Sequence, residues 1–220
     1  MRNIKLFFIV LLAIGGQVFA QNDSPNKNQN VSETKFEKIF KILTEKPKWL
    51  FDDLEICPLE NFPKKAVRLK YLTKPCAENA EHCFNKCQEN EGNACYSLAL
   101  LIQEKKGLEQ EYSEPLFLRS CRLGIISGCT NRAAFIFNTA RGDEKSLRCA
   151  AGTFEKACEM NDPWGCTMFG TVLNLGTGVP KDSEKALRVL SKSCKNGNGD
   201  EACKAAGELI EKIKESKPKN

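Results

Sequence analysis

The stretch Ala157–Gly170, ACEMNDPWGCTMFG, decides how the rest of the chain is interpreted. Two cysteines, Cys158 and Cys166, stand eight residues apart, and a glycine follows the second cysteine after four residues. A pair of this kind fits a metal site, a reactive thiol or a structural disulfide. The choice depends on whether the pattern occurs once or many times.

The pattern occurs four times. The spacings within the pairs are 8, 8, 8 and 9 residues, and successive first cysteines are 34, 37 and 36 residues apart: Cys87/Cys95, Cys121/Cys129, Cys158/Cys166 and Cys194/Cys203. In each copy, Ala or Gly precedes the second cysteine, and Ala or Gly also stands four residues after it. The residue four before the first cysteine is Cys83, Phe117, Phe154 or Leu190. A period of this length suits two helices and two turns.

Helix geometry limits what the paired cysteines can do. In one continuous helix, residues eight apart are separated by about 12 Å along the axis. A disulfide needs Cα atoms roughly 4.4–6.8 Å apart. Each pair can therefore bond only if the chain reverses between its cysteines, and the intervening segments carry residues that break helices: Gly92, Gly124, Pro163, Gly197 and Gly199. We expect four disulfides that each join the end of one helix to the start of the next, with the small residues letting helices pack closely.

These residues resemble Sel1-like repeats, which are related to tetratricopeptide repeats, and the third unit, KACEMNDPWGCTMFGTVLNLGTGVPKDSEKAL, carries the clearest match. One disulfide per repeat is similar to the exported cysteine-rich bacterial proteins of this type and to the related mitochondrial oxidase-assembly factors. The resemblance implies an all-α fold, a right-handed α-solenoid of antiparallel helix pairs with a concave face that binds a protein or peptide. It also implies an alternative, because some bacterial relatives are described as penicillin-binding proteins or weak β-lactamases.

Five segments are expected along the 220 residues. Residues 1–20 are typical of a signal peptide, and their apolar run is shorter than the roughly 20 residues that span a bilayer. We therefore expect export to the periplasm or the medium, without stable membrane insertion. A disordered lead-in (21–31), an N-terminal helical cap (32–74), four repeats (75–214) and a disordered tail (215–220) follow. Within the cap we expect an amphipathic helix from Ser32 and a short second helix from Pro63 to Tyr71.

Composition excludes several kinds of site. The net charge of +5 and the absence of an aromatic-rich basic run argue against nucleic-acid binding. The twelve cysteines and single histidine, His82, lack the close ligand pairs of a zinc site, so we expect no metal and no cofactor. Outside the four pairs, we expect Cys57 to bond Cys76 or Cys83. Cys76 and Cys83 cannot bond each other if they share one helix, and Cys149 could stay free.

Candidate catalytic residues are few. The Ser-x-x-Lys element of serine β-lactamases is matched at Ser32–Lys35 and Ser216–Lys219, but neither companion motif is present. We expect His82 to be a surface residue at a helix start. A third possible function is a redox-linked assembly factor that uses an unpaired cysteine such as Cys149.

Candidate binding residues stand two positions before each first cysteine. Because equivalent positions align along a solenoid, they could form a mostly basic stripe for an acidic segment, or simply a solvated helix face: Asn85, Arg119, Lys156 and Lys192. Trp164 either contacts a partner or packs under its turn. The leading interpretation is a monomeric, exported scaffold that binds a protein or peptide.

Overall fold

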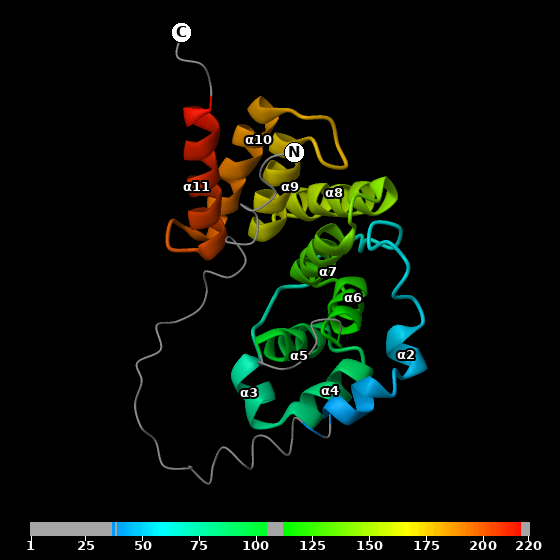
Figure 1. Ribbon diagram of the computed structural model, residues 1–220. Coiled ribbons are helices and arrows are strands. Elements are labelled where there is room, and N and C mark those ends of the chain that lie inside the picture. Colours follow the sequence, from blue (N-terminus) through cyan, green and yellow to red (C-terminus); the bar gives the residue numbers. More distant parts are fainter. Residues whose placement is uncertain (1–36, 38, 105–111, 217–220) are drawn as a thin grey trace, which may run out of the picture.

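The computed structural model describes residue 37 and residues 39–104 and 112–216 (Figure 1). The expected signal peptide, the lead-in and residues 217–220 of the expected tail lie outside this part of the chain. Within it, no helix is both long enough and apolar enough to cross a bilayer.

Antiparallel helix pairs build the body of the protein, and successive pairs stack into one elongated solenoid (Figure 1). The pairs are α4 (Ala80–Gln88) with α5 (Gly92–Glu104), α6 (Glu114–Arg122) with α7 (Ile126–Thr139), α8 (Glu144–Glu159) with α9 (Pro163–Leu175), and α10 (Ser183–Leu190) with α11 (Glu201–Glu215). A 3₁₀ helix, η2 (Ser191–Asn196), continues α10. The described residues contain no strand, and the predicted all-α solenoid of helix pairs is confirmed.

A left-handed residue reverses the chain inside every pair. It stands three residues after the first cysteine, with φ of 70°, 90°, 62° and 96° at Asn90, Gly124, Asn161 and Gly197. In the first three units the next amide donates to the carbonyl five residues back, as Asp162 N does to Ala157 O at 3.0 Å. This is the Schellman arrangement that ends a helix, and Asn and Gly are the residues that adopt it. The reversal brings the paired Cα atoms to between 4.4 and 4.6 Å of each other.

The Gly and Pro residues expected to interrupt the helices between the paired cysteines have different structural roles. Gly92 and Pro163 are the first residues of α5 and α9, so they start the second helix rather than form the turn. Gly124 and Gly197 do form it. The Asn/Gly column three residues after each first cysteine is visible in the sequence and is the signal that marks the turn.

Asn161 should tolerate glycine but not alanine. Both substitutions remove the exposed amide side chain, but only glycine accepts a φ of 62° without steric cost. We expect Asn161→Ala to lower the free energy of unfolding by about 1 kcal/mol. Denaturant unfolding of the oxidised protein measures this; a loss of the same size in Asn161→Gly would assign the effect to the amide group instead.

Small residues set the helix spacing, as the sequence predicts. A Cβ added to Gly165 would lie 2.6 Å from the Ala157 Cβ across the hairpin, and one added to Gly170 would lie 2.5 Å from the Leu190 Cγ of the next unit. The apolar column packs beneath them, since Cys83, Phe117, Phe154 and Leu190 are all buried. The two columns therefore hold helices together within units and between them.

Asp162 ties two units together. Its carboxylate caps α9 by accepting from Gly165 N at 2.9 Å, and it also accepts from Ser127 Oγ at 2.5 Å and Thr130 Oγ1 at 2.7 Å on α7. The side chain is buried. Asp162 is therefore both a helix cap and a link to the preceding repeat.

The glycine column offers a matched stability test. We expect Gly170→Ala to destabilise the protein by about 1–3 kcal/mol, because the new methyl overlaps Leu190 within a packed interface. Gly207 holds the same place in α11 and has no neighbour within 4 Å of an added Cβ, so Gly207→Ala should be neutral or stabilising by about 1 kcal/mol. Equal effects of the two changes in thermal unfolding would contradict this packing account.

The N-terminal region begins as a cap. Residues 39–44 are helical, and Ile39 and Leu43 are buried in the core beside α4 and α5. Short helices α2 (Lys48–Phe51) and α3 (Thr73–Glu78) follow. Ser32 and the start of the expected amphipathic helix lie outside the described residues.

The expected helix from Pro63 to Tyr71 is wrong. These residues are non-helical, because their backbone groups bond the repeats instead of one another. Val67 N donates to Gly124 O at 2.8 Å, and Lys70 N donates to Asn93 Oδ1 at 2.7 Å. Periodicity alone could not reveal these partners, which are distant in sequence.

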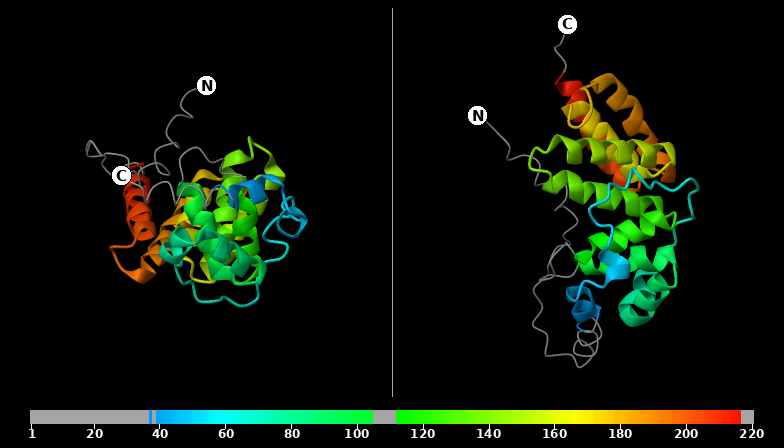
Figure 2. Two further views of the ribbon diagram at one scale, coloured as in Figure 1. Left: turned by 90° about the horizontal axis from the view of Figure 1, so that it is seen from below. Right: turned by 90° about the vertical axis from the view of Figure 1, so that its right-hand side faces the viewer.

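Residues 45–72, here called the strap, run along the solenoid up to α8 and return to α3 (Figures 1 and 2). Arg122 of α6 pairs with Asp53 at 2.8 Å, and Arg132 of α7 donates to Leu54 O at 2.7 Å. At α8, Leu59 lies against Gly152, whose added Cβ would be 2.6 Å from Leu59. The expected cap therefore reaches the third repeat.

Candidate functional site

The predicted binding residues do not form a uniform basic stripe. Asn85 and Lys192 are exposed. Lys156 is also exposed, but its ammonium pairs with Glu159 of the same helix at 2.7 Å. Trp164 is partly buried as the second residue of α9.

Arg119 is occupied within the fold. Its guanidinium donates to Cys87 O at 3.0 Å and Gln88 O at 3.2 Å, carbonyls at the end of α4 that have no partner within that helix. It also donates to Asn90 Oδ1 at 3.0 Å and lies 4.6 Å from the centre of the Trp49 ring. Arg119 thus caps α4 and fixes the strap, and it is not available to a partner.

All twelve cysteines lie in the described residues and all are paired. The four pairs expected from the spacing are disulfides: Cys87–Cys95, Cys121–Cys129, Cys158–Cys166 and Cys194–Cys203. The other two bonds differ from expectation.

Cys57 forms a disulfide with Cys149, 92 residues away, so the prediction that Cys57 pairs with Cys76 or Cys83 is wrong. Of the possibilities left open for Cys149, the free thiol does not occur. The strap carries Cys57 past the first two repeats to α8, a path that no periodic feature of the sequence records. Cys149 therefore holds the strap.

Cys76 bonds Cys83, with Cα atoms 5.4 Å apart. The two do not share a helix, because Asn79 is extended at φ −146° and ψ 81° between α3 and α4. The Asn79 side chain accepts from His82 N and caps α4. An Asn three residues before His82 was the signal for this break. His82 is exposed near the helix start, as predicted.

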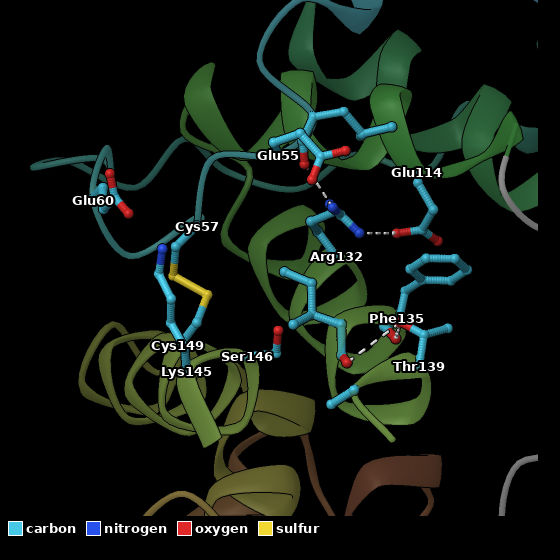
Figure 3. Close-up of a pocket in the computed structure, with 13 residues that line it drawn as sticks. Glu55, Cys57, Glu60, Glu114, Arg132, Phe135, Thr139, Lys145, Ser146 and Cys149 are labelled. Carbon is cyan, nitrogen blue, oxygen red and sulfur yellow. Dashed lines mark hydrogen bonds and ion pairs between the residues drawn. A yellow bond between two sulfur atoms is a disulfide. The ribbon is translucent and has the colours of Figure 1, made fainter. Parts of the chain in front are cut away.

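The strap covers a cleft of about 510 Å³ against α7 and the start of α8 (Figure 3). Leu54, Glu55, Cys57 and Glu60 of the strap line one side. The opposite side comes from the repeats: Glu114, Arg132, Phe135, Ile136, Thr139, Ala140, Lys145, Ser146 and Cys149. Its volume is in the range of small-molecule sites. Sequence reasoning missed this cleft because the strap creates it.

A buried carboxyl and guanidinium group lie side by side in the cleft. Arg132 Nη1 is 3.3 Å from Glu114 Oε2, and both side chains are at least nine-tenths buried. Burial raises the pKa of Glu114 to about 8, against the opposing effect of Arg132. Burial likewise lowers the pKa of Arg132. Desolvation thus outweighs the attraction between the two charges, and Arg132 Nε has no hydrogen-bond partner.

The raised pKa of Glu114 makes stability depend on pH. Between an unfolded pKa near 4.3 and a folded pKa of about 8, the folded state binds more protons than the unfolded state. Stability should therefore fall as pH rises through this window, by up to about 1.4 kcal/mol per pH unit. Glu114→Gln should flatten the slope.

Chemical denaturation at pH 5, 6, 7 and 8 measures that slope. Glu60→Gln is the matched control, since it removes an exposed carboxyl from the rim of the same cleft; the slope assigned to Glu114 should survive it. An unchanged slope in Glu114→Gln would rule out Glu114 as its source.

Other chemistry finds little support in the described residues. They contain no cluster of His, Cys, Asp and Glu suited to a metal ion. Ser216 is exposed beyond α11 and donates to Ile213 O, while Ser32–Lys35 lies outside the described part.

The repeated helix pairs, each closed by a disulfide and packed through Ala and Gly columns, match the pattern expected of Sel1-like repeats. The chain has the fold of an α-solenoid whose disulfide-linked helix pairs resemble Sel1-like repeats. Two solved structures are similar to it. One is Helicobacter pylori cysteine rich protein B, with a TM-score of 0.43 and 26% identity, covering 60% of this chain and 96% of that one. The other is a Sel1 repeat protein from Oxalobacter formigenes, with a TM-score of 0.47 and 18% identity, covering 60% and 97%.

Two curated proteins with a similar sequence are named as cytochrome c oxidase assembly factors. Cytochrome c oxidase assembly factor 7 of Xenopus tropicalis is 26% identical over 119 residues, which are 50% of this chain and 52% of that protein. Cytochrome c oxidase assembly factor 7A of Xenopus laevis is 27% identical over 115 residues, 49% and 50% of the two chains. The chain thus spans about half the length of the curated relatives it matches. No family model matches it.

Proposed function

We propose that the protein is an exported scaffold that holds another protein or a peptide along its repeats. The observation that carries the proposal is the set of six disulfides, which uses every cysteine of the chain. Disulfides of this density persist in oxidising compartments outside the cytosol. They also fix the helix pairs before a partner arrives, which lowers the entropic cost of binding.

The partner-facing residues follow from what the fold leaves exposed. Lys156 and Lys192 stand at equivalent places in successive repeats and are both exposed. Arg119 is excluded because it caps α4. Asn85 adds a polar group in the first unit, and Trp164 adds an aromatic ring in the same unit as Lys156. An acidic segment of a protein or peptide is the partner that this surface fits.

Charge reversal tests the surface. We expect Lys156→Glu combined with Lys192→Glu to reduce capture of the partner from extracts of the exported compartment by on the order of tenfold. The control is Lys64→Glu with Lys181→Glu, which makes the same charge change at exposed residues elsewhere. Equal capture by both double variants would rule out this surface as the binding site.

A nitrocefin assay tests the alternative function. Turnover of nitrocefin by the oxidised protein that a single substitution abolishes would favour a weak β-lactamase over a scaffold.

A second candidate function is an assembly factor. The two curated relatives named above are assembly factors for cytochrome c oxidase, and an assembly role also needs a scaffold that holds a client protein. The version that relies on a free thiol at Cys149 is wrong, because Cys149 is bonded to Cys57.

A further inference from the structure

The disulfide between Cys57 and Cys149 differs from the other five in its exposure. Both of its cysteines are partly exposed to solvent. The cysteines of four other disulfides are all buried: Cys76, Cys83, Cys87, Cys95, Cys121, Cys129, Cys158 and Cys166. In the last repeat Cys194 is partly exposed, but its partner Cys203 is buried. Access to the sulfurs is a main determinant of thiol–disulfide exchange, so the strap disulfide is the one best placed to react.

The same disulfide holds a segment that makes few other contacts with the repeats. The strap is anchored at Leu54, whose carbonyl accepts from Arg132, and at Val67, whose amide donates to Gly124 O. Between these anchors the strap's hydrogen bonds between backbone groups are local, from Ile56 N to Asp53 O and from Glu60 N to Cys57 O. Only Pro58 is buried among residues 55–66. Segments with so little burial open at low cost in free energy.

The charges near the two sulfurs favour a direction of attack. Lys145 stands one helical turn before Cys149 on α8 and lines the same cleft (Figure 3). A nearby cation stabilises a thiolate. Cys57 instead lies between Glu55 and Glu60 in the strap. Cys149 is therefore the better leaving group, and a nucleophile is expected to attack the sulfur of Cys57.

We propose that the Cys57–Cys149 disulfide is an exchange site for a dithiol reductant, and that its reduction releases residues 55–66 and opens the cleft. One thiolate of the reductant attacks the Cys57 sulfur, the Cys57–Cys149 bond breaks, and Cys149 leaves as a thiolate that takes up a proton. The second thiol of the reductant then attacks the mixed disulfide and displaces Cys57. The protein gains two thiols, and the reductant becomes a disulfide.

Opening changes what the cleft presents. The strap supplies Leu54, Glu55, Cys57 and Glu60 to the cleft wall, and Leu59 to the surface of α8 at Gly152. When residues 55–66 leave, the partly buried apolar residues Phe135 and Ile136 of α7 and the surface of α8 at Gly152 become more accessible. The buried repeat disulfides keep the helix pairs intact meanwhile. The oxidised and reduced forms thus differ at one surface of an otherwise unchanged solenoid.

Graded reduction of the native, full-length protein tests the proposal. The protein is treated with increasing dithiothreitol, its thiols are alkylated with iodoacetamide, and the modified cysteines are mapped by mass spectrometry. We expect Cys57 and Cys149 to be alkylated together, on the order of tenfold faster than any cysteine of the repeats. Cys194 and Cys203 provide the internal comparison. Earlier or simultaneous reduction of a repeat disulfide would overturn the proposal.

Limited trypsin digestion tests the release of the strap. Cleavage after Lys64 and Lys65 should accelerate on partial reduction, while cleavage within the repeats should not. The Cys57→Ser/Cys149→Ser variant should be cut at the fast rate without reductant, with the helical circular dichroism of the parent. Selective alkylation with unchanged cleavage in the wild-type protein would refute the opening, whether or not the double variant folds.

Discussion

A single backbone constraint underlies the repeats: the residue three after each first cysteine adopts a left-handed conformation. Because Asn90, Gly124, Asn161 and Gly197 all have positive φ, the chain turns back where a continuous helix would carry the cysteines apart. The disulfide, the helix pairing and the close contact at the small residues all require that reversal. The cysteines stabilise a turn that Asn and Gly make possible; they do not create it. The fourth unit shows the tolerance of the arrangement, since one more residue separates its cysteines and a longer turn between Gly197 and the start of α11 at Glu201 accommodates it.

The repeats were predictable because their information is local and recurs. Four copies of the same spacing fixed the disulfide pairs, and the Ala and Gly columns indicated close packing at Gly165 and Gly170. The strap was not predictable, because its partners are distant and unrepeated. The Val67 amide donates a hydrogen bond to Gly124 O, and Cys57 forms a disulfide with Cys149. No sequence pattern near Val67 or Cys57 indicates either partner. The cleft could not be predicted from the sequence for the same reason, since it exists only where the strap covers α7 and α8.

Two kinds of surface result. On the repeats, exposed residues such as Lys156 and Lys192 occupy equivalent places, and the binding surface proposed there follows from that periodicity. Beneath the strap, the buried Glu114–Arg132 pair is kept at a cost in solvation. Arg119 stands at one of these repeated positions but has a structural role, because it donates to Cys87 O at the end of α4 and packs against Trp49 of the strap. Residues at the same position in successive repeats therefore lie at matching sites on the solenoid. The role of each side chain still follows from its own contacts.

The strap also changes how the molecule should unfold. In a simple solenoid each repeat contacts its neighbours alone, and stability spreads as a chain of nearest-neighbour couplings. Here one segment contacts α6, α7 and α8, and a covalent bond spans 92 residues. The first three repeats are thereby joined into one cooperative unit, whereas the described contacts of α10 and α11 come from the preceding pair and from each other. Loss of structure should begin in that last pair, so the protein behaves as a compact domain at one end and as a repeat array at the other.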